Sequence, residues 1–200
     1  MHILINLMGR PASISQDSLI AAATRVAARL GPARTSIAAV AKEAKVPTGS
    51  IYHRLPSRGA LLAEIWLSAA EGFQREMLAK AASARTLNDL AEAALLTPRF
   101  ARERHTEAVV LNAHRRDDFL APDAPAEYRA RAAKLAAELR DGLATLATRL
   151  LPGDPRGREK LAVAIIGIPL GAVRVFLPQA LPPKEIDATI AAAVRAALRH

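Results

Sequence analysis

The stretch GSIYHR at residues 49–54 places a tyrosine, a histidine and an arginine next to one another, shortly after a glycine. Histidine offers a hydrogen-bond donor, an acceptor and a flat apolar surface, which together suit the edges of nucleic-acid bases. Glycine allows close approach of a backbone, and hydroxyl groups near the start of a helix suit phosphate oxygens. These six residues therefore carry the groups that nucleic-acid recognition uses.

A short helix over residues 48–55 is predicted to position these side chains. Ile51 lies at the centre of its buried face, and a rotation of about 100° per residue places Gly49 and His53 almost opposite. We predict that His53 reads base edges and that Gly49 lets the helix enter a major groove. A single histidine on a helix is more often an ordinary surface residue, so this prediction depends on its neighbours.

The residues beside this stripe have less specific roles. Tyr52 is predicted to contact phosphate, although its ring could equally pack across the three-helix unit. Arg54 is predicted to turn towards the core and to pair with an acidic group. Arg10 lies on an N-terminal arm that could reach a minor groove, and Arg58 is expected to hold a phosphate. The complete set of predicted DNA contacts is Arg10, Ser36, Thr48, Gly49, Ser50, Tyr52, His53 and Arg58.

Two further helices are needed to hold this segment against DNA. A helix is predicted over residues 15–30 with Ser15 as its N-cap, because apolar residues recur at helical spacing and Gly31-Pro32 follows. Ser36 is expected to cap a short helix ending near residue 44, and Ser57 a longer one from Arg58. A long helix followed by two short ones joined by a tight turn forms a helix-turn-helix DNA-binding unit.

The rest of the chain also has a helical pattern. Ala, Leu and Arg dominate, β-branched alternation is nearly absent, and Pro, Gly or Asp punctuate short connections. We predict an all-α fold of about nine helices: an N-terminal arm and helix-turn-helix domain at residues 1–60, and a helical effector-binding and dimerisation domain at residues 61–200. Met8 is a candidate natural start, with residues 1–7 upstream of it.

Charge is unevenly distributed along the 200 residues. The formal net charge is +9, and residues 1–60 hold eight Lys or Arg against Asp17 and Glu43, a net of +6. A basic first third suggests a polyanionic partner, although a merely basic, solvated surface is equally compatible with charge alone.

Several classes of function find no support in the sequence. There is no cysteine, so disulfides and thiolate metal sites are excluded. The most apolar run, residues 161–173, is too short to span a membrane, and the N-terminus lacks a signal-peptide pattern. No catalytic or phosphate-binding motif is present, so we predict a cytoplasmic protein that is not an enzyme and uses no metal or cofactor.

The residues from Thr35 to Leu62 carry a family resemblance. TSIAAVAKEAKVPTGSIYHRLPSRGALL resembles the DNA-binding signature of the tetracycline-repressor (TetR) family of bacterial regulators. The matching residues are Thr35, Ser36, Ile37, Val40, Ala41, Ala44, Val46, Gly49, Ser50, Ile51, Tyr52, Ser57, Arg58 and Leu61. The match covers only about the first third of the chain, and it implies a homodimer that binds operator DNA.

Five positions depart from the family pattern, two of which are Ala38 and Ala39, where polar residues are common. Lys45 replaces the usual turn glycine, which predicts a left-handed backbone at a non-glycine residue. Pro47 replaces the usual capping serine, so either Thr48 takes over the cap or Pro47 is the first helical residue. Leu55 replaces the usual phenylalanine of the core.

The resemblance also implies an effector pocket and a dimer interface in the C-terminal two-thirds. Large side chains expected around the pocket are Trp66, Phe73, Met77, Phe100, Leu111, His114 and Phe119, any of which could equally be core. Apolar stripes on the last two helices are expected at the interface, at Ile165, Ile168, Ala172, Val175, Ile186, Ile190 and Val194, although these faces could instead pack within one subunit.

The function that these features predict is a ligand-responsive transcriptional repressor. It would bind a pseudo-palindromic operator as a homodimer and leave it when a small-molecule effector binds. The alternative is a DNA-binding regulator without a physiological small ligand, acting as an activator or controlled by a protein partner. A C-terminal domain without a sizeable cavity would favour that alternative.

Overall fold

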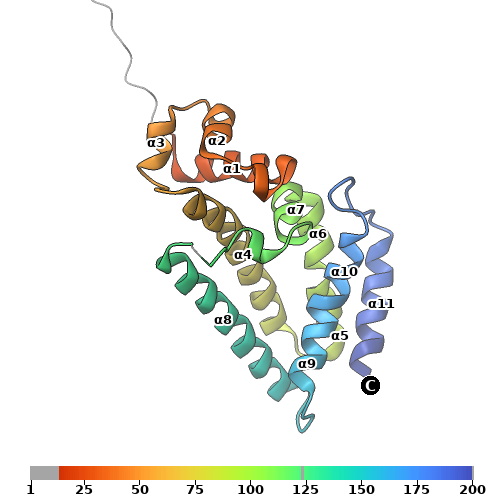
Figure 1. Cartoon of the computed structure of the whole chain (residues 1–200). Coiled ribbons are helices and arrows are strands. Elements are labelled where there is room, and N and C mark those ends of the chain that lie inside the picture. Colours follow the sequence, from red (N-terminus) through yellow and green to blue (C-terminus); the bar gives the residue numbers. More distant parts are fainter. Residues whose placement is uncertain (1–13, 123, 200) are drawn as a thin grey trace, which may run out of the picture.

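The computed structural model describes residues 14–122 and 124–199, and over these ranges the chain is helical with no strand. The predicted all-α class is therefore confirmed. The helices form a small N-terminal group, α1 to α3, set on top of a larger group of longer helices (Figure 1). None of the described helices is both long enough and apolar enough to span a bilayer.

The N-terminal group is built from three helices whose ends are set by local sequence: α1 (Gln16–Leu30), α2 (Ile37–Ala44) and α3 (Thr48–Tyr52). The hydroxyl of Ser15 accepts a hydrogen bond from the N–H of Ser18, and that of Ser36 accepts one from Ala39. Such caps satisfy amide groups that have no partner within the helix. The predicted N-caps Ser15 and Ser36 are confirmed.

The core of this group also includes the first two turns of the next helix. Fully buried Leu19, Val26, Val40 and Ile51 from α1 to α3 pack with Ile65 of α4 (Arg58–Ser83). The hydroxyl of Ser57 caps α4 through the N–H of Ala60, as predicted. Because α4 continues for 26 residues, the helix that completes the N-terminal core also enters the C-terminal domain.

The C-terminal domain packs around the second half of α4. Helix α8 (Ala126–Leu150) runs alongside α4, and α5 (Leu87–Ala94), α6 (Leu96–Glu103) and α7 (His105–Asn112) lie on its other side (Figure 1). The chain ends with α9 (Gly157–Ala162), α10 (Ile168–Arg174) and α11 (Ile186–Arg199). Short 3-10 turns, η1 (Pro32–Arg34) and η2 (Arg116–Asp118), connect neighbouring helices.

Two helical segments of the C-terminal domain are subdivided, and prolines explain both cases. Helices α5 and α6 are separated at Leu95, three residues before Pro98, which lacks the N–H that would continue a single helix. Between α9 and α10 the chain widens into a π-helix, η3 (Val163–Gly167), just before Pro169. There the N–H of Ile168 reaches back five residues to the carbonyl of Val163.

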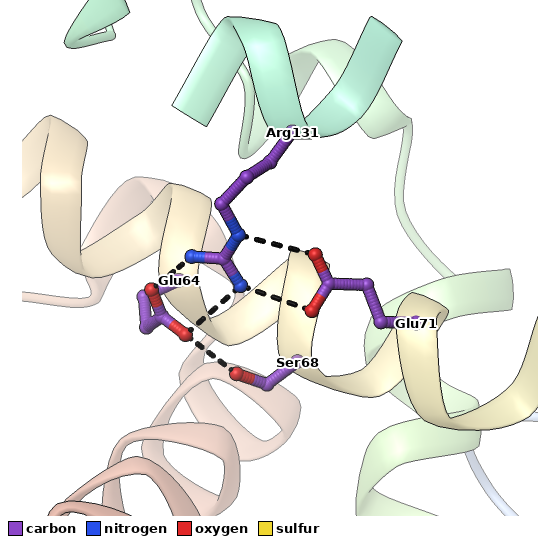
Figure 2. Close-up of polar contacts among 4 residues, drawn as sticks. All are labelled: Glu64, Ser68, Glu71 and Arg131. Atoms are coloured by element: carbon purple, nitrogen blue, oxygen red, sulfur yellow. Dashed lines mark hydrogen bonds and ion pairs between the residues drawn. The ribbon is translucent and has the colours of Figure 1, made fainter. Parts of the chain in front are cut away.

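An ion-pair cluster fastens α8 to α4. The guanidinium of Arg131 donates to Glu64 at 2.6 and 3.3 Å and to Glu71 at 3.1 and 3.0 Å, and the hydroxyl of Ser68 donates to Glu64 at 2.8 Å (Figure 2). Hydrogen bonds from Arg131 to Glu71 and then Glu64 raise the pKa of the arginine above its usual value. Glu64 and Glu71 lie about two helical turns apart on α4. One arginine of α8 bridges both carboxylates, which fixes the register of α4 and α8.

Replacing Arg131 with methionine should lower the free energy of unfolding by about 1–2 kcal/mol, since Glu64 and Glu71 would lose their shared cation in a partly buried site. Urea unfolding measures this loss. Lys134→Met, on the same helix at an exposed position with only a 3.8 Å pair to Glu138, should change stability by less than about 0.5 kcal/mol. Equal effects of the two substitutions would contradict the bridging role of Arg131.

Candidate nucleic-acid interface and effector cavity

Helix α3 presents a polar face to solvent, as the helical rotation predicts. Ile51 is fully buried, whereas Gly49, Ser50 and His53 are exposed and Tyr52 is 54% exposed. A Cβ added at Gly49 would meet no atom within 4 Å, so packing inside the subunit does not require glycine there. The space above Gly49 is open, so another molecule can approach α3 closely there, beside the ring of His53.

The prediction for Arg54 is wrong. Helix α3 ends at Tyr52 and not near residue 55, so the chain leaves the helix before Arg54 can turn inward. Arg54 is exposed, and its side chain takes part in none of the hydrogen bonds or ion pairs among the described residues. It therefore lies beside His53 as an available cation on the same exposed surface.

The turn between α2 and α3 has the backbone that the sequence predicts. Lys45 adopts φ 57° and ψ 42°, a left-handed conformation that costs a non-glycine residue some free energy. Pro47 is the N-cap residue of α3 and Thr48 its first helical residue, so neither predicted alternative is correct. Helix α3 has no side-chain cap, and in its first turn the N–H of Ser50 donates to the carbonyl of Pro47 at 3.1 Å.

The other predicted DNA contacts fall into three situations. Thr48 is exposed at the first turn of α3. Ser36 is half-buried, and its hydroxyl is occupied by the cap of α2. Arg10 lies outside the described residues.

Arg58 has a structural role that the sequence did not reveal. Its Nε donates to the carbonyl of Thr35 at 2.9 Å, and its Nη2 donates to Pro32 at 2.6 Å and Ala33 at 3.0 Å. These carbonyls belong to η1 and the residue that follows it, so Arg58 ties the start of α4 to the connection between α1 and α2. These hydrogen bonds give Arg58 a role inside the subunit, and its contact with phosphate stays a prediction.

The remaining basic residues divide into paired and available groups. Arg25 and Arg29 both bind Glu43, at 2.9 and 3.2 Å, and these hydrogen bonds, that from Arg25 first, lower the pKa of Glu43. Lys42, Lys45 and Arg54 are exposed and form no ion pair among the described residues. The cations available to an outside anion are therefore those on α2, on the turn, and beside α3.

The second candidate site is a cavity of about 200 Å³ inside the C-terminal domain. Five of the seven predicted pocket residues border it: Trp66, Phe73, Met77, Phe100 and Leu111. They come from α4, α6 and α7, and the rings of Phe73 and Phe100 lie 4.9 Å apart. The structure thus brings together large side chains that the sequence separates by up to 45 residues.

His114 and Phe119 lie elsewhere. Phe119 is 1% exposed and packs in the core of the N-terminal group with Val110 and Ile65. His114 lies edge-on to Phe119, with ring centroids 6.0 Å apart, and its Cε1 is close to Gly31. Because the chain turns after α7 towards the N-terminal domain, these two side chains fill the interface between the domains and do not border the cavity.

Sequence reasoning missed the polar residues of the cavity. Gln74, Thr97 and Asn112 border it, and they are 8%, 3% and 7% exposed. A signal for Gln74 was present, since it follows Ala70 and precedes Met77 at the helical spacing of an apolar face. The remaining wall residues are Ala70, Leu135, Leu139, Ile165, Ile166 and Leu170.

Comparison with known proteins agrees with this geometry. Residues 19–65, which run from α1 into α4, match the family model described as bacterial regulatory proteins, tetR family. This match covers 47 of the 200 residues, about a quarter of the chain. The part that the family model recognises is the helix-turn-helix and the start of α4.

Solved tetR-family structures share the fold over nearly the whole chain. The transcriptional regulator FadR from Bacillus subtilis, in complex with stearoyl-CoA, has a TM-score of 0.69 at 17% identity, covering 92% of this chain and 99% of that one. A TetR family regulator from Marinobacter aquaeolei VT8 has a TM-score of 0.65 at 17% identity, covering 90% and 93%. AibR, in complex with isovaleryl coenzyme A and operator DNA, has a TM-score of 0.64 at 17% identity, covering 90% and 95%.

Among curated protein sequences, none matches this chain. At 17% identity the solved structures show a shared fold alone. Among its described residues, no group of three or more His, Asp or Glu side chains is arranged to hold a metal ion.

The residues predicted at the dimer interface lie at different depths in this regulator. Ile165, Ile190 and Val194 are at most 1% exposed and pack inside the subunit with α5 and α11. Ile168, Ala172 and Ile186 are half-buried, and Val175 is 78% exposed. Side chains sealed inside one subunit cannot add contact area with another, so a second copy would meet the outer faces of these helices.

Replacing Arg58 with methionine should lower the free energy of unfolding by about 1–2 kcal/mol, because three carbonyls lose their charged donor. Arg54→Met is the matched control, since its side chain has no partner to lose, and it should stay within about 0.5 kcal/mol. Thermal or urea unfolding measures both. If Arg58→Met is as stable as Arg54→Met, the positioning role of Arg58 is wrong.

Proposed function

We propose that this regulator is a ligand-responsive repressor that binds a pseudo-palindromic operator as a homodimer in the cytoplasm. Two copies would place their α3 helices in successive major grooves about 34–36 Å apart. His53 would read base edges, while Lys42, Lys45 and Arg54 would meet phosphates. An effector in the cavity would favour a conformation in which the two α3 helices no longer fit these grooves.

The observation that carries this proposal is the position of α7 between the cavity and the N-terminal core. Val110 of α7 is fully buried in the core formed with α1 to α3. The next two residues, Leu111 and Asn112, border the cavity. A displacement of α7 by a ligand would therefore move a residue on which the N-terminal domain packs, because close-packed cores deform little.

Helix α4 provides a second connection between the same two regions. Trp66 borders the cavity and also packs against the N-terminal core, while Arg116 stacks over its ring at 5.5 Å. Since α4 also carries Ile65 in that core, movement at the cavity and movement of α3 are linked through one continuous helix.

Two considerations support a small-molecule effector over partner-only control. The C-terminal domain contains a largely apolar cavity, whose absence would have favoured the alternative function. Two structures of the same fold were solved with acyl-coenzyme A molecules, and one of these also with operator DNA. An effector that disfavours the DNA-bound conformation would release the operator, as a repressor requires.

A dimer would use the outer faces of η3, α10 and α11. Val163, Gly167 and Gly171 are exposed at four-residue spacing along η3 and α10, and Ala188, Ala192 and Ala196 are exposed at the same spacing on α11. Helices α10 and α11 lie side by side (Figure 1), so these small residues form one surface. Two such surfaces could approach closely in a four-helix interface.

Ala192→Glu should convert the protein to monomers at micromolar concentration, because a charge would be buried in the closely packed interface. Ala136→Glu is the matched control on the exposed face of α8 and should leave the assembly unchanged. Sedimentation velocity measures both. A dimer that survives Ala192→Glu, or a wild-type monomer, would rule out this interface.

Operator fragments selected from random DNA allow the recognition residues to be tested separately. His53→Ala should reduce discrimination between the operator and a variant with one changed base pair by about tenfold, since a base-edge contact is lost. Arg54→Ala should weaken binding to all sequences and reduce the slope of log affinity against log salt by about one. Fluorescence anisotropy at several salt concentrations measures both effects. Unchanged affinity and specificity in His53→Ala would contradict the groove assignment.

A further inference from the structure

The three polar residues of the cavity limit the chemistry of its ligand. Among the described residues that line the cavity none is charged, and three are aromatic: Trp66, Phe73 and Phe100. A carboxylate or ammonium group placed there would lose its hydration without gaining a counter-ion, which is costly. The part of the ligand that occupies this cavity is therefore neutral and largely apolar.

Hydrogen bonds fix the orientation of the two amide side chains. The Nε2 of Gln74 donates to the carbonyl of Leu135 at 2.8 Å, and the Nδ2 of Asn112 donates to that of Ala108 at 2.9 Å. A carbonyl only accepts hydrogen bonds, so in each amide the nitrogen must face it and the oxygen must point away. Neither amide oxygen accepts a hydrogen bond within the described part of the chain.

Thr97 adds a hydroxyl with no partner. Its side chain is 3% exposed, and its Oγ1 takes part in no hydrogen bond within residues 14–122 and 124–199. Within these ranges, the fully enclosed side-chain atom that has no hydrogen-bond partner is Nδ1 of His105. The side-chain oxygens of Gln74, Asn112 and Thr97 therefore each keep some accessible surface. The residues that border the cavity therefore hold two amide oxygens without a donor and one hydroxyl, beside the second N–H of each amide, on an otherwise apolar wall.

We propose, on the basis of the proposed function, that the effector is a small neutral molecule with an apolar, aromatic-sized body and a hydroxyl or N–H group that donates a hydrogen bond inside the cavity. A phenol or an alcohol has this chemistry. An ester, ether or carboxylate offers acceptors alone and would leave the amide oxygens of Gln74 and Asn112 without a donor.

The volume of the cavity sets the size of this molecule. Its space of about 200 Å³ is somewhat larger than the roughly 150 Å³ apolar cavity that holds benzene. A ligand of about eight to ten non-hydrogen atoms fits this space.

Gln74 also borders an outer groove between α4 and α8. Its hydrogen bond to Leu135 lies in the wall between this groove and the cavity. That wall is a candidate entry route.

Isothermal titration calorimetry with three probes of similar shape tests this ligand class on the full-length protein. The probes are p-cresol, which donates a hydrogen bond, 4-methylanisole, which lacks the donor, and 4-methylbenzoate, which is an anion. We expect p-cresol to bind at least about tenfold more tightly than either of the others. Equal binding of p-cresol and 4-methylanisole, tighter binding of 4-methylbenzoate, or no binding of p-cresol at millimolar concentration would overturn the proposal.

Variants assign the preference to the cavity. Thr97→Val and Asn112→Leu each remove one oxygen at similar side-chain size and should reduce the preference for p-cresol over 4-methylanisole to about threefold or less. Thr24→Val is the matched control, because Thr24 is a buried threonine of α1 whose hydroxyl bonds to Ile20 away from the cavity. A preference that persists in both cavity variants, or that is lost in Thr24→Val, would overturn the assignment.

Operator release is measured separately, so that the two proposals can fail independently. If p-cresol binds with the expected preference and leaves operator affinity unchanged, the ligand class stands and ligand-responsive repression fails. If another compound releases the operator while p-cresol does not bind, repression stands and the ligand class is wrong.

Discussion

The architecture depends on the continuity of α4. Its first turns supply Leu61, Leu62 and Ile65 to the core of the helix-turn-helix domain, and its later turns supply Phe73 and Met77 to the wall of the cavity. A single 26-residue helix cannot move at one end independently of the other. The bridge from Arg131 to Glu64 and Glu71 then fastens the middle of this helix to α8.

This continuity gives a physical form to the proposed regulation. A ligand can change DNA affinity only by as much as it prefers one conformation over the other. Here α4 and α7 both border the cavity, and both place a buried residue, Ile65 and Val110, in the N-terminal core. Arg174 of α10 also donates to the carbonyl of Asn112 at 2.7 Å, so the proposed dimer helices are joined to the end of α7.

Features fixed by local chemistry were predictable from the sequence. The caps at Ser15, Ser36 and Ser57, the helix end at Gly31-Pro32 and the left-handed backbone at Lys45 each follow from a few neighbouring residues. Helical rotation likewise identified the buried Ile51, and the family resemblance indicated most of the large side chains around the cavity.

Features set by contacts between distant segments were not predictable in this way. Arg58 bonds to carbonyls more than 20 residues away, and Phe119 joins a core made largely of residues before position 66. The early end of α3, which exposes Arg54, depends on how the chain must turn to begin α4. Gln74 is an intermediate case. The sequence shows that it lies on an apolar helix face, but not that its side chain donates to the carbonyl of Leu135.

The distance between the two N-terminal domains of a dimer tests the central claim most directly. The chain has no cysteine, so Ala33→Cys, on the exposed surface of η1, allows one spin label per subunit. Pulsed electron paramagnetic resonance would then measure the distance between labels with operator DNA and with a cavity ligand. We expect a narrow distribution on the operator and a shifted one with the ligand. Identical distributions, with the ligand nevertheless releasing the operator, would contradict coupling through α4 and α7.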